Sequence, residues 1–163
     1  MQAGSKTVEN TRAMKTIRNE NCREELIIRL NALDREAQPL WGRMNVEQML
    51  SHLAQTADWP FGHSVPDRSN LISRTILKPL VIYLLPVPKE VKTSPQVDQL
   101  QEGRRPQGFE TDRELVIDGI NKLGTLPETQ DCCEHPFFGK MSAKQWALLA
   151  HKHIDHHLKQ FGA

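Results

Sequence analysis

Cysteine and net charge are both scarce in this chain of 163 residues. The only thiols are Cys22, Cys132 and Cys133, and so few cysteines favour a reduced interior over a disulfide framework. Lys and Arg number 21 against 20 Asp and Glu, which leaves a formal net charge of +1. A balance of this kind gives no global field to attract nucleic acid. We therefore expect a cytoplasmic protein with no nucleic-acid partner.

Long hydrophobic runs are missing as well. The most apolar stretch, residues 71–85, is interrupted by Arg74, Lys78 and Pro79 and is shorter than the ~20 residues that a membrane-spanning helix needs. We expect no membrane span and interpret this stretch as an extra helix that packs on the rest of the fold and could cover a pocket. Its paired apolar and basic character leaves a membrane-surface or partner role open. The polar first twelve residues lack the apolar segment of a signal peptide.

What the sequence does contain is a series of helical patterns separated by helix breakers. We expect residues 1–15 to form a flexible leader and residues 16–163 to form one all-α domain, which is within the usual size of a single core. Apolar spacing, capping signals and breakers predict four main helices over residues 21–37, 45–59, 111–124 and 142–162. The Pro- and Gly-containing segment 86–108 is predicted to be a long loop.

The last predicted helix carries two histidines on its apolar side. With Trp146 at zero on a helical wheel, His153 and His157 fall within roughly 60° of it. Imidazoles four residues apart on a helix can reach one metal ion. A set of residues on the opposite arc is assigned to a solvated face, namely His151, Asp155 and His156.

A third ligand has to come from elsewhere, and His52 is the best candidate because it lies at the edge of the buried face of the second helix. His63 and His135 are the remaining histidines. A lone buried histidine is more often just hydrogen bonded, but a neighbouring pair leaves two ring acceptors to satisfy. A three-His set keeps coordination positions open for water or substrate. His135, in the loop before the last helix, is a weak catalytic candidate and equally well a turn residue.

Three segments in order carry a resemblance to a known family: L-W-G-R-M-N-V-E-Q-M-L-S-H-L at 40–53, H-P-F-F-G-K-M-S at 135–142 and W-A-L-L-A-H-K-H-I-D-H-H-L-K-Q-F-G at 146–162. Over residues 16–162 the chain resembles the DinB-like superfamily of metal-binding helical bundles, in a branch known as a domain of unknown function. The resemblance implies an up-down-down-up four-helix bundle, here with an extra helix and a long loop inserted between core helices two and three. It also implies the metal ligands His52, His153 and His157.

Better understood relatives in that superfamily are thiol-dependent transferases and an isomerase, so the resemblance implies an ion that activates water or a low-molecular-weight thiol. We expect zinc or nickel, a small cytosolic substrate, and a monomer or homodimer. The H-E-x-x-H protease pattern is excluded because Ile154 follows His153. A di-iron carboxylate site is excluded because the nearest acid, Asp155, points away from the histidines on the wheel. Two alternatives remain. One is a non-catalytic metal-binding bundle that acts in stability, sensing or protein interaction, and the other is a metal-free helical scaffold.

Overall fold

The structure is a computed structural model that describes residues 14–62, 66–89 and 94–163, and this part of the chain is helical, as predicted. Its α-helices are α1 (Glu20–Asn31), α2 (Val46–Ala57), α3 (Phe109–Gly124) and α4 (Ala143–Gln160). The short helical segments are η1 (Trp59–Phe61), η2 (Ser73–Leu77) and η3 (Leu80–Leu84). Within the described ranges the one β-type pairing is an isolated bridge between His135 and Gly139. The predicted leader up to residue 13, and His63, lie outside the described residues.

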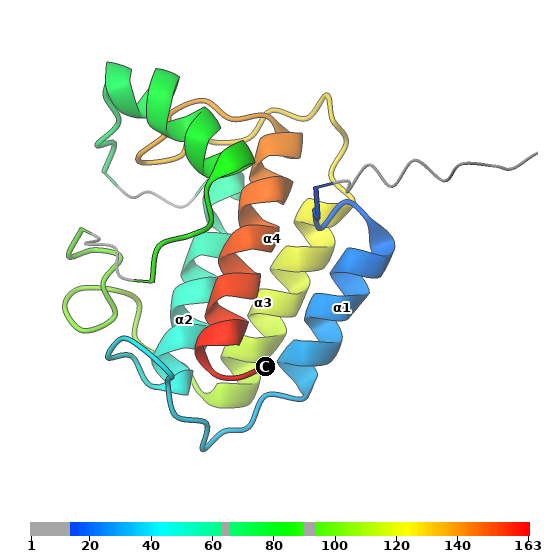
Figure 1. The fold of residues 1–163 in the computed structure, drawn as a ribbon, viewed down its shortest axis with the longest axis vertical. Helices are drawn as coiled ribbons and strands as arrows, with labels where there is room; N and C mark the ends of the chain where they lie inside the picture. Colours follow the sequence, from blue (N-terminus) through cyan, green and yellow to red (C-terminus); the bar gives the residue numbers. More distant parts are fainter. Residues whose placement is uncertain (1–13, 63–65, 90–93) are drawn as a thin grey trace, which may run out of the picture.

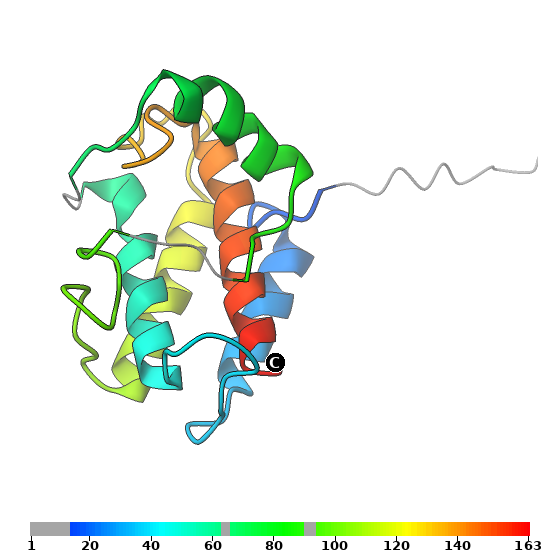
Figure 2. The same ribbon diagram turned by 60° about the vertical axis from the view of Figure 1, so that its left-hand side comes forward.

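The four α-helices lie side by side, and both ribbon views agree on this arrangement (Figures 1 and 2). Helices α2 and α3 run in one direction, whereas α1 and α4 run in the other (Figure 1). The buried side chains of these helices form one core. It includes Leu26, Leu30, Met49, Leu50, Leu53, Val116, Ile120, Trp146, Ile154 and Leu158.

Two predicted helix starts are confirmed in atomic detail. The Asn45 side chain accepts from the Gln48 backbone, and the Gln48 side chain accepts from the Asn45 backbone. Ser142 and Gln145 exchange the same two bonds at the start of α4. Such reciprocal caps satisfy amide groups that the first helical turn leaves without partners. They fix where the two helices that carry the candidate ligands begin.

The first helix is shorter than the predicted span of residues 21–37, because α1 ends at Asn31. After it the Asp34 carboxylate accepts from the Glu36 backbone, and the Asp34 carbonyl accepts from the Ala37 backbone. Side chains such as Asp favour turns because they offer the backbone this local alternative to helical hydrogen bonds. Leu33 is still buried, as its apolar spacing predicted.

The start of α3 also differs from the prediction. The helix begins at Phe109 rather than Thr111, and its N-cap is Gly108, which has a φ of 125° and no side-chain cap. Phe109 is buried, so the two additional residues place an aromatic ring in the core. The predicted buried face holds for Val116, Ile120 and Leu123, whereas Leu115 is 39% exposed.

The stretch 71–84 is helical, as predicted, but two parts of it, η2 and η3, have the wider π-helical turn. Pro79 separates them, and proline cannot donate the amide that a regular helix would use there. The stretch lies across the upper end of the other helices (Figures 1 and 2). Among the described residues, no helix is long and apolar enough to cross a membrane.

Helices α2 and α3 are in close contact at Gly119. A Cβ atom added to Gly119 would lie 2.6 Å from the Cβ of Ala57. We predict that Gly119→Ala lowers the free energy of unfolding by about 1 to 3 kcal/mol, because the two backbones must separate. The loss should exceed the small gain in helix propensity that alanine brings.

The double variant Gly119→Ala/Ala57→Gly tests the cause, because it removes the atom that the new methyl group meets. Urea denaturation of the four proteins in this cycle should give a favourable coupling between the two substitutions. A more stable Gly119→Ala protein would show that the helices tolerate the methyl group.

Candidate metal centre

The structure brings together the three histidines that the sequence singled out. His52 comes from α2 and His153 and His157 from adjacent turns of α4. The His153 Nε2 atom lies 3.1 Å from His52 Nε2 and 3.1 Å from His157 Nε2. All three candidate ligand atoms lie within 4.8 Å of one another. His52 and His157 are each 7% exposed, and His153 is partly exposed.

The two short contacts of His153 Nε2 cannot both be strong hydrogen bonds. In a neutral imidazole each ring nitrogen carries either one hydrogen or one lone pair. If His153 Nε2 is a donor, its one hydrogen either bonds to one neighbour or is shared by both in a weaker three-centre bond. If it is an acceptor, its one lone pair serves only one neighbour well. Hydrogen bonding among the three rings therefore leaves at least one close contact poorly satisfied.

A single divalent cation would remove that conflict, since three lone pairs can point at one ion. Imidazole nitrogens bind zinc at about 2.0 to 2.1 Å, which in tetrahedral geometry separates two ligand nitrogens by about 3.3 to 3.4 Å. Two of the three separations, at 3.1 Å, are close to this spacing, and the third is no more than 4.8 Å. The cluster could thus hold a metal ion with three neutral ligands.

The tautomer of His157 is fixed by a relay of two hydrogen bonds. The Gln160 amide nitrogen donates to the Trp41 carbonyl at 2.7 Å, which leaves the Gln160 oxygen facing His157. His157 Nδ1 then donates to that oxygen at 2.8 Å. With its hydrogen on Nδ1, the ring presents the Nε2 lone pair to the cluster. Metal-binding histidines commonly have an outer partner of this type.

Gly42 makes the relay possible. Its φ is 79°, and a Cβ atom at this position would lie 2.7 Å from the Gln160 amide nitrogen. The Leu40 amide donates to the Gln160 carbonyl at 2.7 Å, which holds the same loop against the end of α4. The L-W-G segment is therefore a clamp for Gln160. It acts through main-chain atoms, so no side-chain pattern in the sequence could have revealed it.

Burial keeps the three rings neutral. It lowers the pKa of His52 to about 4 and that of His157 to about 3, and it lowers the pKa of His153 well below 6.5. His52 Nδ1 has no hydrogen-bond partner of standard geometry within the described residues. The Val97 backbone lies near His52 and partly offsets the lowering of its pKa. Neutral imidazole is the form that binds a metal.

His135 is placed differently from the other three. It is 6% exposed, its ring stacks on Phe138, and its Nδ1 accepts from the backbone of Phe137 and Phe138 at 3.1 and 3.3 Å. Its backbone forms the two hydrogen bonds of the bridge with Gly139. These contacts define a turn residue that organises the H-P-F-F-G loop. Burial lowers the pKa of His135 to about 3.

The predicted solvated face of α4 is wrong. His151 is 4% exposed, and Asp155 is held by Arg29 of α1 at 2.8 Å and by Lys159 at 2.7 Å. His156 is partly buried and packs edge-on against Trp41 and against His157. The reason is tertiary, because α1 packs against the side of α4 that the wheel gave to solvent. The helical wheel centred on Trp146 identified the histidine pair but did not predict that His151, on the other side of α4, is also buried.

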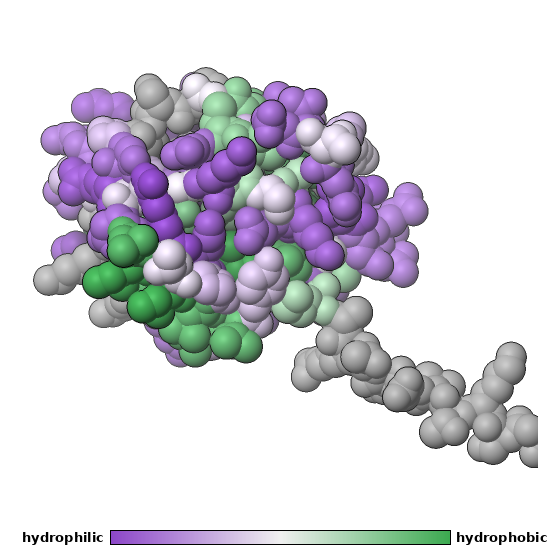
Figure 3. Space-filling model, turned by 90° about the horizontal axis from the view of Figure 1, so that it is seen from above, coloured by the Kyte–Doolittle hydropathy of each residue, from purple (hydrophilic) through white to green (hydrophobic). Residues whose placement is uncertain are grey.

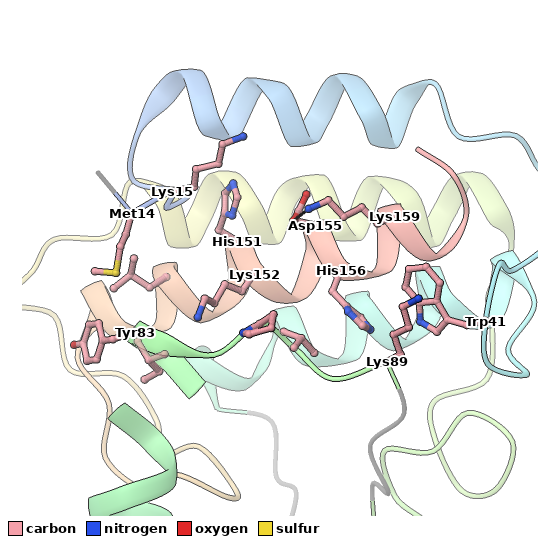
Figure 4. A pocket seen from close by; sticks show the side chains of 14 residues that line it. Met14, Lys15, Trp41, Tyr83, Lys89, His151, Lys152, Asp155, His156 and Lys159 are labelled. Carbon is pink, nitrogen blue, oxygen red and sulfur yellow. Dashed lines mark hydrogen bonds and ion pairs between the residues drawn. The ribbon is translucent and has the colours of Figure 1, made fainter. Parts of the chain in front are cut away.

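A groove of about 440 Å³ runs along this second side of α4 (Figure 4). Its walls are largely apolar and include Ile82, Val87 and Leu148, with Trp41 and Tyr83 as its aromatic residues. Four lysines and one acid, Asp155, also line it. The lysines are Lys15, Lys89, Lys152 and Lys159. The groove is therefore cationic. It lies next to the histidine cluster through His156, whose ring centroid is 5.1 Å from the His157 ring centroid.

Together these features define an all-helical protein with a buried cluster of three histidines that could bind a metal. Residues 15–163 match the family described as a protein of unknown function (DUF1569), and the chain belongs to that family. No curated protein and no solved structure matches this chain.

The relay behind His157 generates a first prediction. Gln160→Leu removes the acceptor for His157 Nδ1 and should weaken binding of zinc or cobalt(II) by about 10- to 100-fold. Isothermal titration with the neighbouring Lys159→Leu variant as control measures the difference, since Lys159 is exposed and pairs only with Asp155 among the groups described here. Equal affinity in the two variants would show that the relay does not orient the ligand.

His135 generates a second prediction, on stability against pH. Its folded pKa of about 3 lies below the unfolded value near 6.5, so the unfolded chain binds its proton first as the pH falls. The contribution of His135 is complete above pH ~6.5 and declines by about 1.4 kcal/mol per pH unit as the pH falls toward ~3. His135→Asn keeps an acceptor for the two backbone amides but does not titrate.

Urea denaturation of the chelator-treated proteins between pH ~4.5 and ~7.5 measures this effect. The His135→Asn protein should lose less stability per pH unit than the wild type below pH ~6.5. Parallel pH profiles of the two proteins would mean that the pKa of His135 is the same in the folded and the unfolded state.

Proposed function

We propose that this protein binds a divalent metal ion through His52, His153 and His157 and uses it on a small molecule. The observation that carries the proposal is the convergence of three imidazole nitrogens, with two 3.1 Å contacts at His153 Nε2 that one shared hydrogen satisfies poorly. The fixed tautomer of His157 and the neutral state of all three rings support the same conclusion. Zinc and nickel are the proposed ions, because imidazole nitrogen suits both.

The proposed chemistry is hydrolysis or group transfer. When bound, a divalent ion lowers the pKa of a bound water or thiol and so supplies a nucleophile near neutral pH. Three protein ligands leave room for such a molecule, unlike the four ligands of a closed structural site. Within the part of the chain that the structure describes, no carboxylate belongs to the cluster, so neutral ligands would leave the ion its full charge.

The proposed substrate is a small cytosolic molecule, with a low-molecular-weight thiol as a possible partner in transfer. The groove along α4, which none of the three cluster histidines lines, would suit a molecule with negative charge and an apolar part, because four lysines and an apolar wall line it. Asp155, the acid among the described residues that line it, is already held by Arg29 and Lys159. His156 connects the two sites, because it lines the groove and packs against His157.

We also propose that residues 16–163 form a DinB-like domain, an up-down-down-up four-helix bundle with residues 60–108 inserted between its second and third helices. The directions of α1 to α4 in Figure 1 support this topology. The position of the ligands supports it too, with one histidine on the second helix and two on the fourth. The alternative is a centre without catalysis, in which the ion serves stability or sensing by joining α2 to α4.

The decisive measurement is elemental analysis of protein purified without an affinity tag or chelator. The wild type should carry close to one ion per chain, and the His153→Ala/His157→Ala variant should carry almost none. His156→Ala is the matched control, because it removes an imidazole next to His157 that is not part of the cluster. Wild-type protein that stays free of metal after incubation with zinc and with nickel would refute the proposal.

A second measurement separates catalysis from a structural role. Thiol-transfer and hydrolysis assays on small anionic substrates should give turnover that disappears with chelation and returns with metal. Thermal unfolding is recorded on the same samples. A large fall in melting temperature on chelation, with no turnover in wild-type protein, would favour the non-catalytic alternative.

A further inference from the structure

The helical stretch 71–84 exposes its large apolar side chains, whereas an ordinary surface helix buries them. Six large apolar side chains along it and directly after it are exposed: Leu71, Ile72, Ile76, Leu77, Leu84 and Leu85, from 43% to 77%. Ser73 and Ile82 are its only buried residues in the described structure. A surface helix normally buries its apolar side and exposes its polar side. Something other than the hydrophobic core must therefore account for this orientation.

Polar contacts hold the inner side of the stretch. Lys78 Nζ donates to the Lys140 carbonyl at 2.9 Å, and the Arg68 amide donates to the Pro136 carbonyl at 2.8 Å. The Arg74 side chain lies so close to Gly139 that a Cβ there would be 2.9 Å from its Nε. At the other end, Lys152 of α4 donates to the carbonyls of Val81 and Leu85. The fold anchors this helix by its polar groups and leaves its apolar side outward.

The exposed apolar side chains gather in one area. Figure 3, seen from above, shows hydrophobic side chains collected on one part of this end of the molecule, next to a largely hydrophilic surface. Exposed patches of this kind mark interaction sites, whereas scattered apolar residues need no explanation. Exposed apolar side chains elsewhere, such as Met14 at 51%, Ile28 at 67% and Leu40 at 70%, belong to other segments.

The charges around the patch indicate what covers it. Residues 68–85 contain three cations, Arg68, Arg74 and Lys78, and no acid. Asp67 directly before them pairs with Arg74, and the Lys78 ammonium group donates to a carbonyl. A symmetric contact between two copies would bring these cations together, because the same patch occupies both sides of a two-fold interface. An anionic surface instead attracts every one of them.

We propose that the stretch 71–85 docks on an anionic lipid surface, lying in the interface with its apolar side chains in the acyl region. A helix with exposed Leu and Ile side chains flanked by Arg and Lys has the composition of an interfacial helix. Tyr83, which is 40% exposed, has the amphipathic ring that suits the headgroup level. The proposal is independent of the metal centre, because no cluster histidine belongs to this stretch.

The test is flotation of the full-length protein with vesicles at low salt. Binding to phosphatidylcholine vesicles that contain phosphatidylglycerol should exceed binding to phosphatidylcholine alone by at least about tenfold, and salt should weaken it. Ile72→Ser/Ile76→Ser should abolish binding, while Ile28→Ser/Leu40→Ser, which changes equally exposed residues elsewhere, should leave it intact. Arg68→Gln should weaken binding to the anionic vesicles by about fivefold, because it removes one cation next to the patch.

Several outcomes would overturn the proposal. These are absence of binding to anionic vesicles, equal binding of the two apolar variants, and equal binding to both kinds of vesicle. Sedimentation velocity on the same proteins detects the competing occupant. Self-association that the Ile72→Ser/Ile76→Ser variant loses, in a protein that does not bind vesicles, would assign the patch to a second copy of the chain. Unchanged melting temperatures of the variants confirm that folding is intact.

Discussion

Three imidazole rings that share too few hydrogens are the constraint around which this molecule is built. His52, His153 and His157 meet in a largely buried region, where water cannot easily supply missing partners. Their lowered pKa values show that protonation is an expensive way to relieve the conflict. A bound cation would relieve it, because three lone pairs could point at one positive centre. Several elements of the fold hold the rings in this close arrangement.

Several elements share this task. Reciprocal caps fix where α2 and α4 begin. The starts of the helices in turn help to place the ligands opposite each other. Gly119 lets α2 approach α3 closely, which fixes the position of the helix that carries His52. Gly42 brings the loop after α1 against Gln160 and so determines the orientation of His157. Two glycines that do not themselves contact the cluster thus help to determine its geometry.

The parts that the sequence predicted well are those that local chemistry decides. The caps at Asn45 and Ser142 and the His153–His157 pair depend on residues three or four apart, which a helical pattern places directly. The parts it missed depend on distant neighbours. His151 is buried because α1 covers it, and the Trp41 carbonyl is a main-chain atom that no side-chain pattern reveals. The outward apolar side of 71–84 contradicts the rule on which helical-wheel analysis rests.

The distance in sequence between the ligands has a consequence of its own. His52 and His153 are 101 positions apart, so an ion held by both would close a loop that contains most of the chain. A covalent link across a loop of about 100 residues removes unfolded-state entropy worth about 4.7 kcal/mol. The three cysteines of this protein are free and provide no such link. A bound ion would therefore act as a reversible cross-link between the first and last parts of the chain, one whose strength the surrounding metal concentration controls.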